Sequence, residues 1–131
     1  LALGPGASNG ETQLAGDISV WVTRDQLAFS VRDAGVSRFL ETGDVVDISV
    51  LAGFHPRSEA HLDFVIAGGL GISRGHHIGG AVLSTAPVAA FNTQLNLNYR
   101  VVGAALDGFA AVGPSRSYYG VGLALALGWF R

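Results

Sequence analysis

Residues 121–129 alternate strictly between bulky and very small side chains. Successive side chains of an extended strand point to opposite faces, so this alternation predicts a β-strand with two different faces. One face carries bulky apolar side chains and the other carries only very small ones: Val121, Leu123, Leu125, Leu127 and Trp129 on the first, and Gly122, Ala124, Ala126 and Gly128 on the second. A strand of a water-soluble sheet usually opposes apolar to polar side chains. The contrast here suits a strand with lipid outside and a crowded interior.

Composition agrees with a membrane protein that crosses by strands. Hydrophobic residues make up 49% of the 131 residues and charged residues 14%, against about 25% charged in ordinary soluble domains. No run of 18 apolar residues occurs, which excludes a transmembrane helix. The net charge of −2 offers no basic surface for nucleic acid. The absence of Cys excludes disulfides and thiol chemistry.

Eight segments have strand character, and we expect them to form a single domain over residues 1–131. They are residues 1–6, 13–24, 26–34, 44–55, 61–74, 86–98, 101–113 and 118–130. The first is interrupted by Pro5 and Gly6 and is interpreted as a truncated strand. The chain also has no Met and no leader-like start, so we interpret it as a processed chain or a fragment of a longer one.

The connections between these segments alternate in length. The turns around Asp25, at 56–60 and at 100–101 are short, whereas 35–43 and 75–85 are long; 7–12 is of medium length. Outer-membrane barrels have short periplasmic turns and longer outer loops. The fold class predicted is therefore all-β, an eight-stranded antiparallel up-and-down transmembrane β-barrel with periplasmic termini in a bacterial outer membrane.

Outward-facing aromatic residues collect near the short turns in this arrangement. They are Phe29, Phe54, Phe64, Tyr99 and Trp129. Aromatic side chains are enriched where a membrane meets water. We therefore expect them to form an interfacial girdle.

Alternation alone does not say which face is inside. A soluble lipocalin-like ligand-binding barrel would bury Leu123, Leu125 and Leu127 around a cavity and turn its polar faces to water. The opposing faces here carry Gly, Ala, Ser and Asn in place of Lys and Glu. Small side chains suit the narrow interior of an eight-stranded barrel, which favours the membrane arrangement.

In strand pattern and loop rhythm, nearly the whole chain resembles the small outer-membrane β-barrels, the class of the outer-membrane protein A transmembrane domain. The resemblance is one of architecture and not of motifs. In that class the last strand usually ends in an aromatic residue that the barrel-assembly machinery recognises. Phe130 matches this pattern, although Arg131 follows it.

Charged residues on the predicted inner faces form the main candidate site. Asp17, Arg32 and Asp47 lie on three consecutive segments towards the long loops, with Asp17 opposite or diagonal to Arg32. Buried ions must be paired, so we expect an ion network that closes the interior to solutes. A second, looser set is expected from three more residues: Asp63, Arg100 and Asp107.

His55 and His61 flank the turn at 56–60, and we expect them to face each other across a hairpin with Asp63 nearby. Two imidazoles and a carboxylate are metal-ligand types, but no third or fourth ligand is evident. We therefore interpret them as polar residues at a wet mouth and expect no metal and no cofactor.

A lipid-modifying barrel enzyme is the alternative function. It would need a His beside a Ser or Asp near the outer rim. The local candidates are His76, His77, Ser73, Ser84 and Ser117, and they form no recognised motif.

The expected function is therefore not enzymatic: a structural, anchoring or partner-scaffolding barrel whose interior is plugged by side chains. Its expected partners are outer-membrane lipid, the barrel-assembly machinery and further subunits of a membrane complex that contact loops 35–43 and 75–85.

Overall fold

The computed structural model describes residues 1–8, 10–37, 45–56, 61–75, 84–99, 101–114 and 117–127. Eight strands run through these residues: β1 (Ala2–Ser8), β2 (Glu11–Arg24), β3 (Leu27–Ser37), β4 (Val45–Phe54), β5 (Leu62–Gly75), β6 (Ser84–Tyr99), β7 (Val102–Val112) and β8 (Ser117–Leu127). In the part of the chain described, no helix has the length and apolar character needed to cross a membrane.

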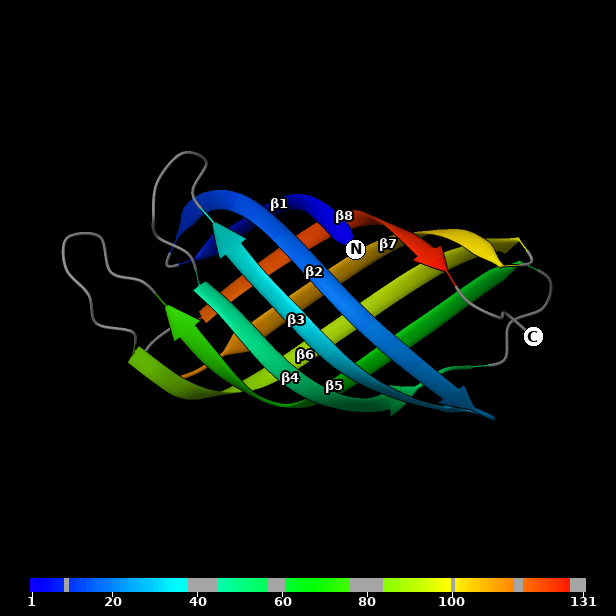
Figure 1. Cartoon of the computed structure of the whole chain (residues 1–131), viewed down its shortest axis with the longest axis horizontal. Coiled ribbons are helices and arrows are strands. Elements are labelled where there is room, and N and C mark those ends of the chain that lie inside the picture. Colours follow the sequence, from blue (N-terminus) through cyan, green and yellow to red (C-terminus); the bar gives the residue numbers. More distant parts are fainter. Residues whose placement is uncertain are drawn as a thin grey trace.

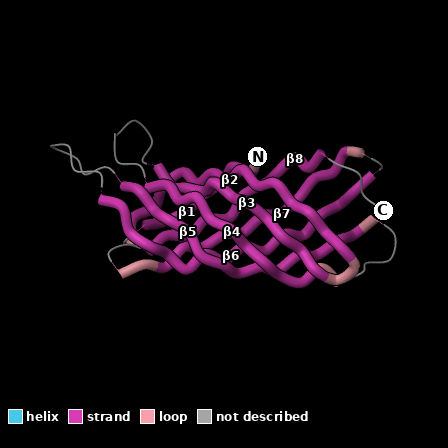
Figure 2. The backbone as a smooth tube through the Cα atoms, turned by 60° about the horizontal axis from the view of Figure 1, so that its bottom comes forward, coloured by secondary structure: helices cyan, strands magenta, loops and turns pink. Residues whose placement is uncertain are grey.

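The eight strands form one closed ring. Each strand pairs antiparallel with its neighbours in sequence, and β1 pairs with β8. The strands run obliquely to the long axis (Figure 1), and in a second view the near and far walls cross one another (Figure 2). The predicted all-β, antiparallel, up-and-down arrangement of eight strands is confirmed.

Three predicted connections are shorter in the structure. The connection predicted at 75–85 is one of them, because β5 runs to Gly75 and β6 begins at Ser84. β3 continues to Ser37, so residues 35–37 belong to a strand and not to a loop. The alternation of buried and exposed side chains continues past Gly35, since Val36 is buried on the same inner face as Ala34. Likewise, β1 extends to Ser8 and β2 begins at Glu11, which shortens the connection predicted at 7–12. In this connection Gly10 has a positive φ of 82°, a conformation that glycine adopts at little cost.

The bulky apolar face of each strand is the outer face. Leu123, Leu125 and Leu127 of β8 are 75%, 72% and 80% exposed, whereas Ala124 and Ala126, which alternate with them on the opposite face, are less exposed. The soluble arrangement, in which these three leucines surround a cavity, is therefore not the one adopted.

The two ends of the ring differ. At one end, β2 meets β3 through Asp25 and Gln26, and β6 meets β7; we call this the turn end. We call the other end the loop end: β3 finishes there at Ser37, and β4 begins there at Val45. Four of the five predicted girdle residues are exposed on the outer face within three residues of the turn-end strand termini: Phe29, Phe54, Phe64 and Tyr99. Trp129 lies outside the described residues.

β1 is the shortest strand and covers only part of its neighbours. It pairs with β2 from Glu11 to Asp17 and with β8 from Tyr118 to Ala124. Residue Leu1 therefore lies part-way along the ring (Figure 1). Within the described residues, the stretch 18–24 of β2 pairs with β3 alone.

Candidate functional site

Arg32 occupies the centre of the ring and is completely buried. The register places it level with Ser19 of β2 and Ser49 of β4. Asp17 and Asp47 precede these two serines by two positions, towards the loop end, and lie on the same inner face. Diagonal neighbours across antiparallel strands are within reach of a long side chain, so local register alone brings the three charges together.

The guanidinium of Arg32 contacts both near and distant walls. Its Nη2 donates to both carboxylate oxygens of Asp47, at 3.0 and 2.7 Å. Its Nη1 donates to the backbone carbonyl of Phe91 on β6 at 2.7 Å, and its Cζ lies 5.5 Å from the centre of the Phe109 ring on β7. Two-point pairing with a carboxylate is among the strongest polar contacts in proteins. One side chain thus connects β3, β4, β6 and β7.

Asp17 is held less completely than Asp47. Its Oδ2 lies 3.9 Å from Arg32 Nε, and neither atom has a hydrogen-bond partner among the described residues. Its Oδ1 accepts a hydrogen bond of 3.2 Å from Ser19 Oγ. Asp47 also accepts from Ser49 Oγ at 3.0 Å.

Asp107 adds a third buried carboxylate to the interior. It is fully buried on β7 and accepts a hydrogen bond of 3.2 Å from Asn92 Nδ2 on β6. It is close enough to Asp17 for the two to interact electrostatically. Three carboxylates therefore share the interior with one guanidinium, which leaves this cluster with an excess of negative charge when all four are ionised.

The structure brings Asp17, Arg32 and Asp47 together in the manner expected. It does not group Asp63 with Asp107, as the second expected set required. Asp63 lies at the turn end, with its Oδ1 2.7 Å from His55 Nε2, whereas Asp107 lies deeper, beside Asn92. Arg100, the third member, is outside the described residues.

The predicted pairing of His55 with His61 is wrong. Phe54 pairs with Ile66, so the next residue of β4, His55, is level with Val65 and not with His61. The His61 ring instead lies beside the Tyr99 ring, with the ring centres 6.0 Å apart and the planes tilted by 49°, and the His61 carbonyl accepts from the Asn98 backbone N–H at 2.8 Å. Among the described residues, no group of three His, Cys, Asp or Glu side chains could hold a metal ion.

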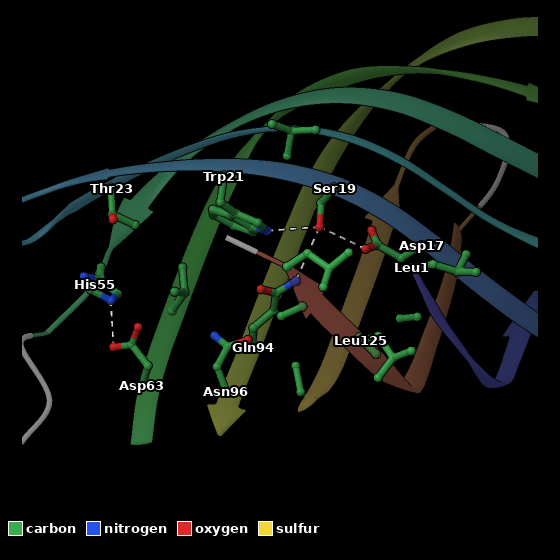
Figure 3. Close-up of a pocket in the computed structure, with 17 residues that line it drawn as sticks. Leu1, Asp17, Ser19, Trp21, Thr23, His55, Asp63, Gln94, Asn96 and Leu125 are labelled. Carbon is green, nitrogen blue, oxygen red and sulfur yellow. Dashed lines mark hydrogen bonds and ion pairs between the residues drawn. The ribbon is translucent and has the colours of Figure 1, made fainter. Parts of the chain in front are cut away.

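The sequence interpretation did not assign a role to several interior residues. Trp21 Nε1 donates to Ser19 Oγ at 3.0 Å, and Gln94 Nε2 donates to the same oxygen at 3.4 Å (Figure 3). Phe109 and Tyr118 pack edge-to-face at 6.5 Å beside Arg32. The sequence signal that places these side chains inside the ring is the two-residue alternation, because each of them shares the inner face of its strand with small or polar residues.

The predicted partner loops lie mostly outside the described residues, as do His76 and His77 of the alternative enzyme site. Ser73 is buried on the inner face and donates to the Ala86 carbonyl at 3.3 Å. Ser117 is exposed at the start of β8.

Fold and site together define an all-β protein: a closed, eight-stranded up-and-down ring with an ion-paired interior. No protein-family model matches the chain, and no curated protein matches it significantly.

Proposed function

We propose that this chain is an integral β-barrel of a bacterial outer membrane with a structural, anchoring or partner-scaffolding role. The single observation that carries the proposal is the inverted distribution of side chains. Large apolar residues are exposed on the outside of all eight strands, while Arg32, Asp47 and Asp107 are fully buried inside.

Such an outer surface is poorly suited to water. Monomeric soluble proteins rarely expose a continuous apolar patch larger than a few hundred Å². Here the exposed set encircles the ring and includes strongly exposed members: Val20, Ile48, Leu70, Leu97, Leu106 and Leu123. A lipid bilayer removes the cost of exposing these side chains, and tilted strands of about 9–11 residues suffice to cross it.

The interior supports a closed barrel and not a general pore. Arg32, Asp47, Leu51 and Tyr118 are nearly or completely inaccessible to solvent. An eight-stranded barrel is just wide enough for side chains to fill. The proposed partners are therefore outer-membrane lipid, the barrel-assembly machinery and proteins that contact the loop end.

Membrane extraction tests this proposal. The chain is expressed in bacteria behind an outer-membrane export signal, and the membrane fraction is washed with alkaline carbonate and with urea. We expect the protein to stay in the membrane pellet and to migrate on gels differently before and after boiling, as a folded barrel does. A water-soluble monomer that stays dispersed without detergent would contradict the proposal.

A pair of variants on one strand makes the test specific. Leu123→Arg introduces a charge on the outer face of β8, where an arginine in mid-membrane costs about 2–4 kcal/mol, whereas Tyr119→Arg lies near the loop end, where the cost is about 0–1 kcal/mol. We expect the first variant to reduce insertion far more than the second. Equal insertion of both variants would count against a surrounding bilayer.

A further inference from the structure

The bulky outer face of the ring is interrupted on β2 and β3. Gly16 and Gly35 are partners in the register there, each on the outer side of its strand. They form the floor of a shallow hollow, the outer hollow, whose walls are apolar side chains of β1, β2 and β4: Leu3, Leu14, Ile18 and Val46. β2 and β3 pair continuously from Leu14 to Arg24, so the floor of the outer hollow does not depend on where β1 begins.

The fold leaves free space above Gly16. A Cβ added there would meet Leu3 Cδ2 at 3.5 Å and the Ala2 carbonyl oxygen at 3.8 Å, which are ordinary contact distances. A larger side chain therefore fits at this position without moving the backbone. The flanking outward residues of β2, Leu14 and Ile18, are large and exposed. The outer hollow is thus a gap in the apolar surface that another molecule can enter.

Asp33 places a carboxylate at the edge of the outer hollow. Its side chain is exposed on the outer face and lines the hollow, and the register places it between Ile18 and Ile48. Among the described residues it has no ion-pair partner. It lies four positions from Ser37, the loop-end terminus of β3. Every other charged side chain that the described strands place on the outer face is within one position of a strand terminus, so Asp33 is the exception in the middle of the apolar surface.

In the bilayer that the proposed function requires, a carboxylate at this depth needs a partner. Ionisable groups inside membranes are costly and usually pair with one another, and opposite charges attract most strongly where the dielectric constant is low. A second copy of the chain does not supply the cation. A symmetric contact joins the same patch of both copies and sets Asp33 against Asp33, while Arg74 lies one position from the loop-end terminus of β5 and so not at the depth of Asp33.

We propose that the outer hollow docks an apolar membrane-spanning segment of another protein, which carries a lysine or arginine at the depth of Asp33. The segment packs into the space above Gly16 and Gly35, because small residues let neighbouring backbones approach closely in a membrane. Its cation pairs with the Asp33 carboxylate. This inference rests on the proposed function, since it requires a bilayer around the ring, and it specifies the kind of partner that the barrel holds.

Synthetic peptides in phosphatidylcholine vesicles test the proposal. Each peptide has about 20 apolar residues, enough to span a bilayer as a helix, with identical ends and one central lysine, leucine or glutamate. The chain has no Cys, so Ser117→Cys at the exposed start of β8 accepts a single donor dye, and the peptide carries the acceptor. We expect saturable energy transfer with the lysine peptide at a peptide-to-lipid ratio about tenfold lower than with the leucine peptide, and the weakest transfer with the glutamate peptide.

Matched variants assign the association to the outer hollow. Asp33→Asn removes the carboxylate and Gly16→Leu fills the hollow, and each should weaken binding of the lysine peptide to the level of the leucine peptide. Asp25→Asn makes the same charge change in the turn after β2, where asparagine tolerates the positive φ of 56°. Gly68→Leu makes the same size change on the outer face of β5. Both controls should leave binding unchanged; if Asp33→Asn does not insert, the two glycine variants decide.

Insertion of each protein is established first, by its migration on gels before and after boiling. A protein that does not insert contradicts the proposed function, and this inference with it. A protein that inserts but binds the lysine peptide no more tightly than the leucine peptide overturns this inference alone. So does intact binding in Gly16→Leu, or a loss in Asp25→Asn as large as in Asp33→Asn. Energy transfer between donor-labelled and acceptor-labelled barrels without peptide, abolished by Gly16→Leu, would make a second copy the occupant and also overturn it.

Discussion

Arg32 is a buried cation whose partners come from four strands. Removing one partner of a buried ion pair leaves the other charge buried and unpaired. The free-energy cost of that unpaired charge exceeds the stabilisation that the intact pair provides. Asp47 would lose both of its guanidinium contacts, and the Phe91 carbonyl would lose its side-chain donor.

We predict that Arg32→Met lowers the free energy of unfolding by about 3–5 kcal/mol, the range for breaking one side of a buried ion pair. Urea unfolding of the protein in detergent or vesicles measures it. Arg24→Met, at the exposed turn end of β2, is the control and should change stability by less than about 0.5 kcal/mol. The double variant Arg32→Met/Asp47→Leu should recover part of the loss; no recovery would mean that charge pairing is not the cause.

Asp33 is the neighbour of Arg32 but faces the other way. It is exposed on the outer face, where the register places it between Ile18 of β2 and Ile48 of β4. In the proposed barrel this carboxylate faces lipid, which is unfavourable for an ionisable group.

Replacing this carboxylate distinguishes lipid from water around the ring. We predict that Asp33→Leu raises the free energy of unfolding in vesicles by about 1 kcal/mol. Arg74→Leu, near the loop end of β5 on the same outer face, should have a much smaller effect. A loss of solubility without any stability gain would instead indicate an aqueous surface.

At the scale of the strand, glycines on the inner face set how closely neighbouring strands approach. A Cβ added at Gly69 of β5 would collide with the Val50 carbonyl oxygen and would lie 2.9 Å from Leu51 Cα on β4. These are backbone atoms, so relief requires the two strands to move apart.

We predict that Gly69→Ala destabilises the protein by about 1–3 kcal/mol, as overpacking does. Its neighbour Gly68 is a matched control, because a Cβ there would meet the Phe91 ring at 3.4 and 3.5 Å and the Ala90 carbonyl oxygen at 3.8 Å, which are ordinary contact distances. Thermal unfolding of both variants checks the difference; equal stabilities would show that β4 and β5 separate without cost.

Alternation also explains which parts of the fold could be predicted from sequence. A period of two determines which residues share a face, so the opposite orientations of Leu125 and Ala126 follow from the strand pattern, and the approach of Asp17 to Arg32 follows from that pattern and one tight turn. The position of His55 did not follow, because the offset between β4 and β5 depends on the residues that connect them. Asp107 was assigned to the wrong neighbours for a related reason: the depth of a residue in a closed ring depends on the accumulated register of several strands.

At the scale of the whole molecule, the filled centre predicts electrical behaviour. We expect the protein in planar lipid bilayers to show no steady ion current, because Arg32 and the residues packed around it occupy the interior. Arg32→Ala should produce measurable conductance, while Phe29→Ala on the outer face should not. A large current through the unaltered protein would contradict a plugged interior.

The contact between Arg32 and the Phe91 carbonyl also constrains the order in which the molecule assembles. Asp47 is on the adjacent strand and is available as soon as β3 and β4 pair, whereas Phe91 is 59 positions away in sequence. Contacts between distant positions form late, because a long segment must be ordered first. The guanidinium can therefore complete its bonding only when the sheet has curved enough to bring β6 opposite β3, so desolvation of this charge and closure of the ring belong to the same folding step.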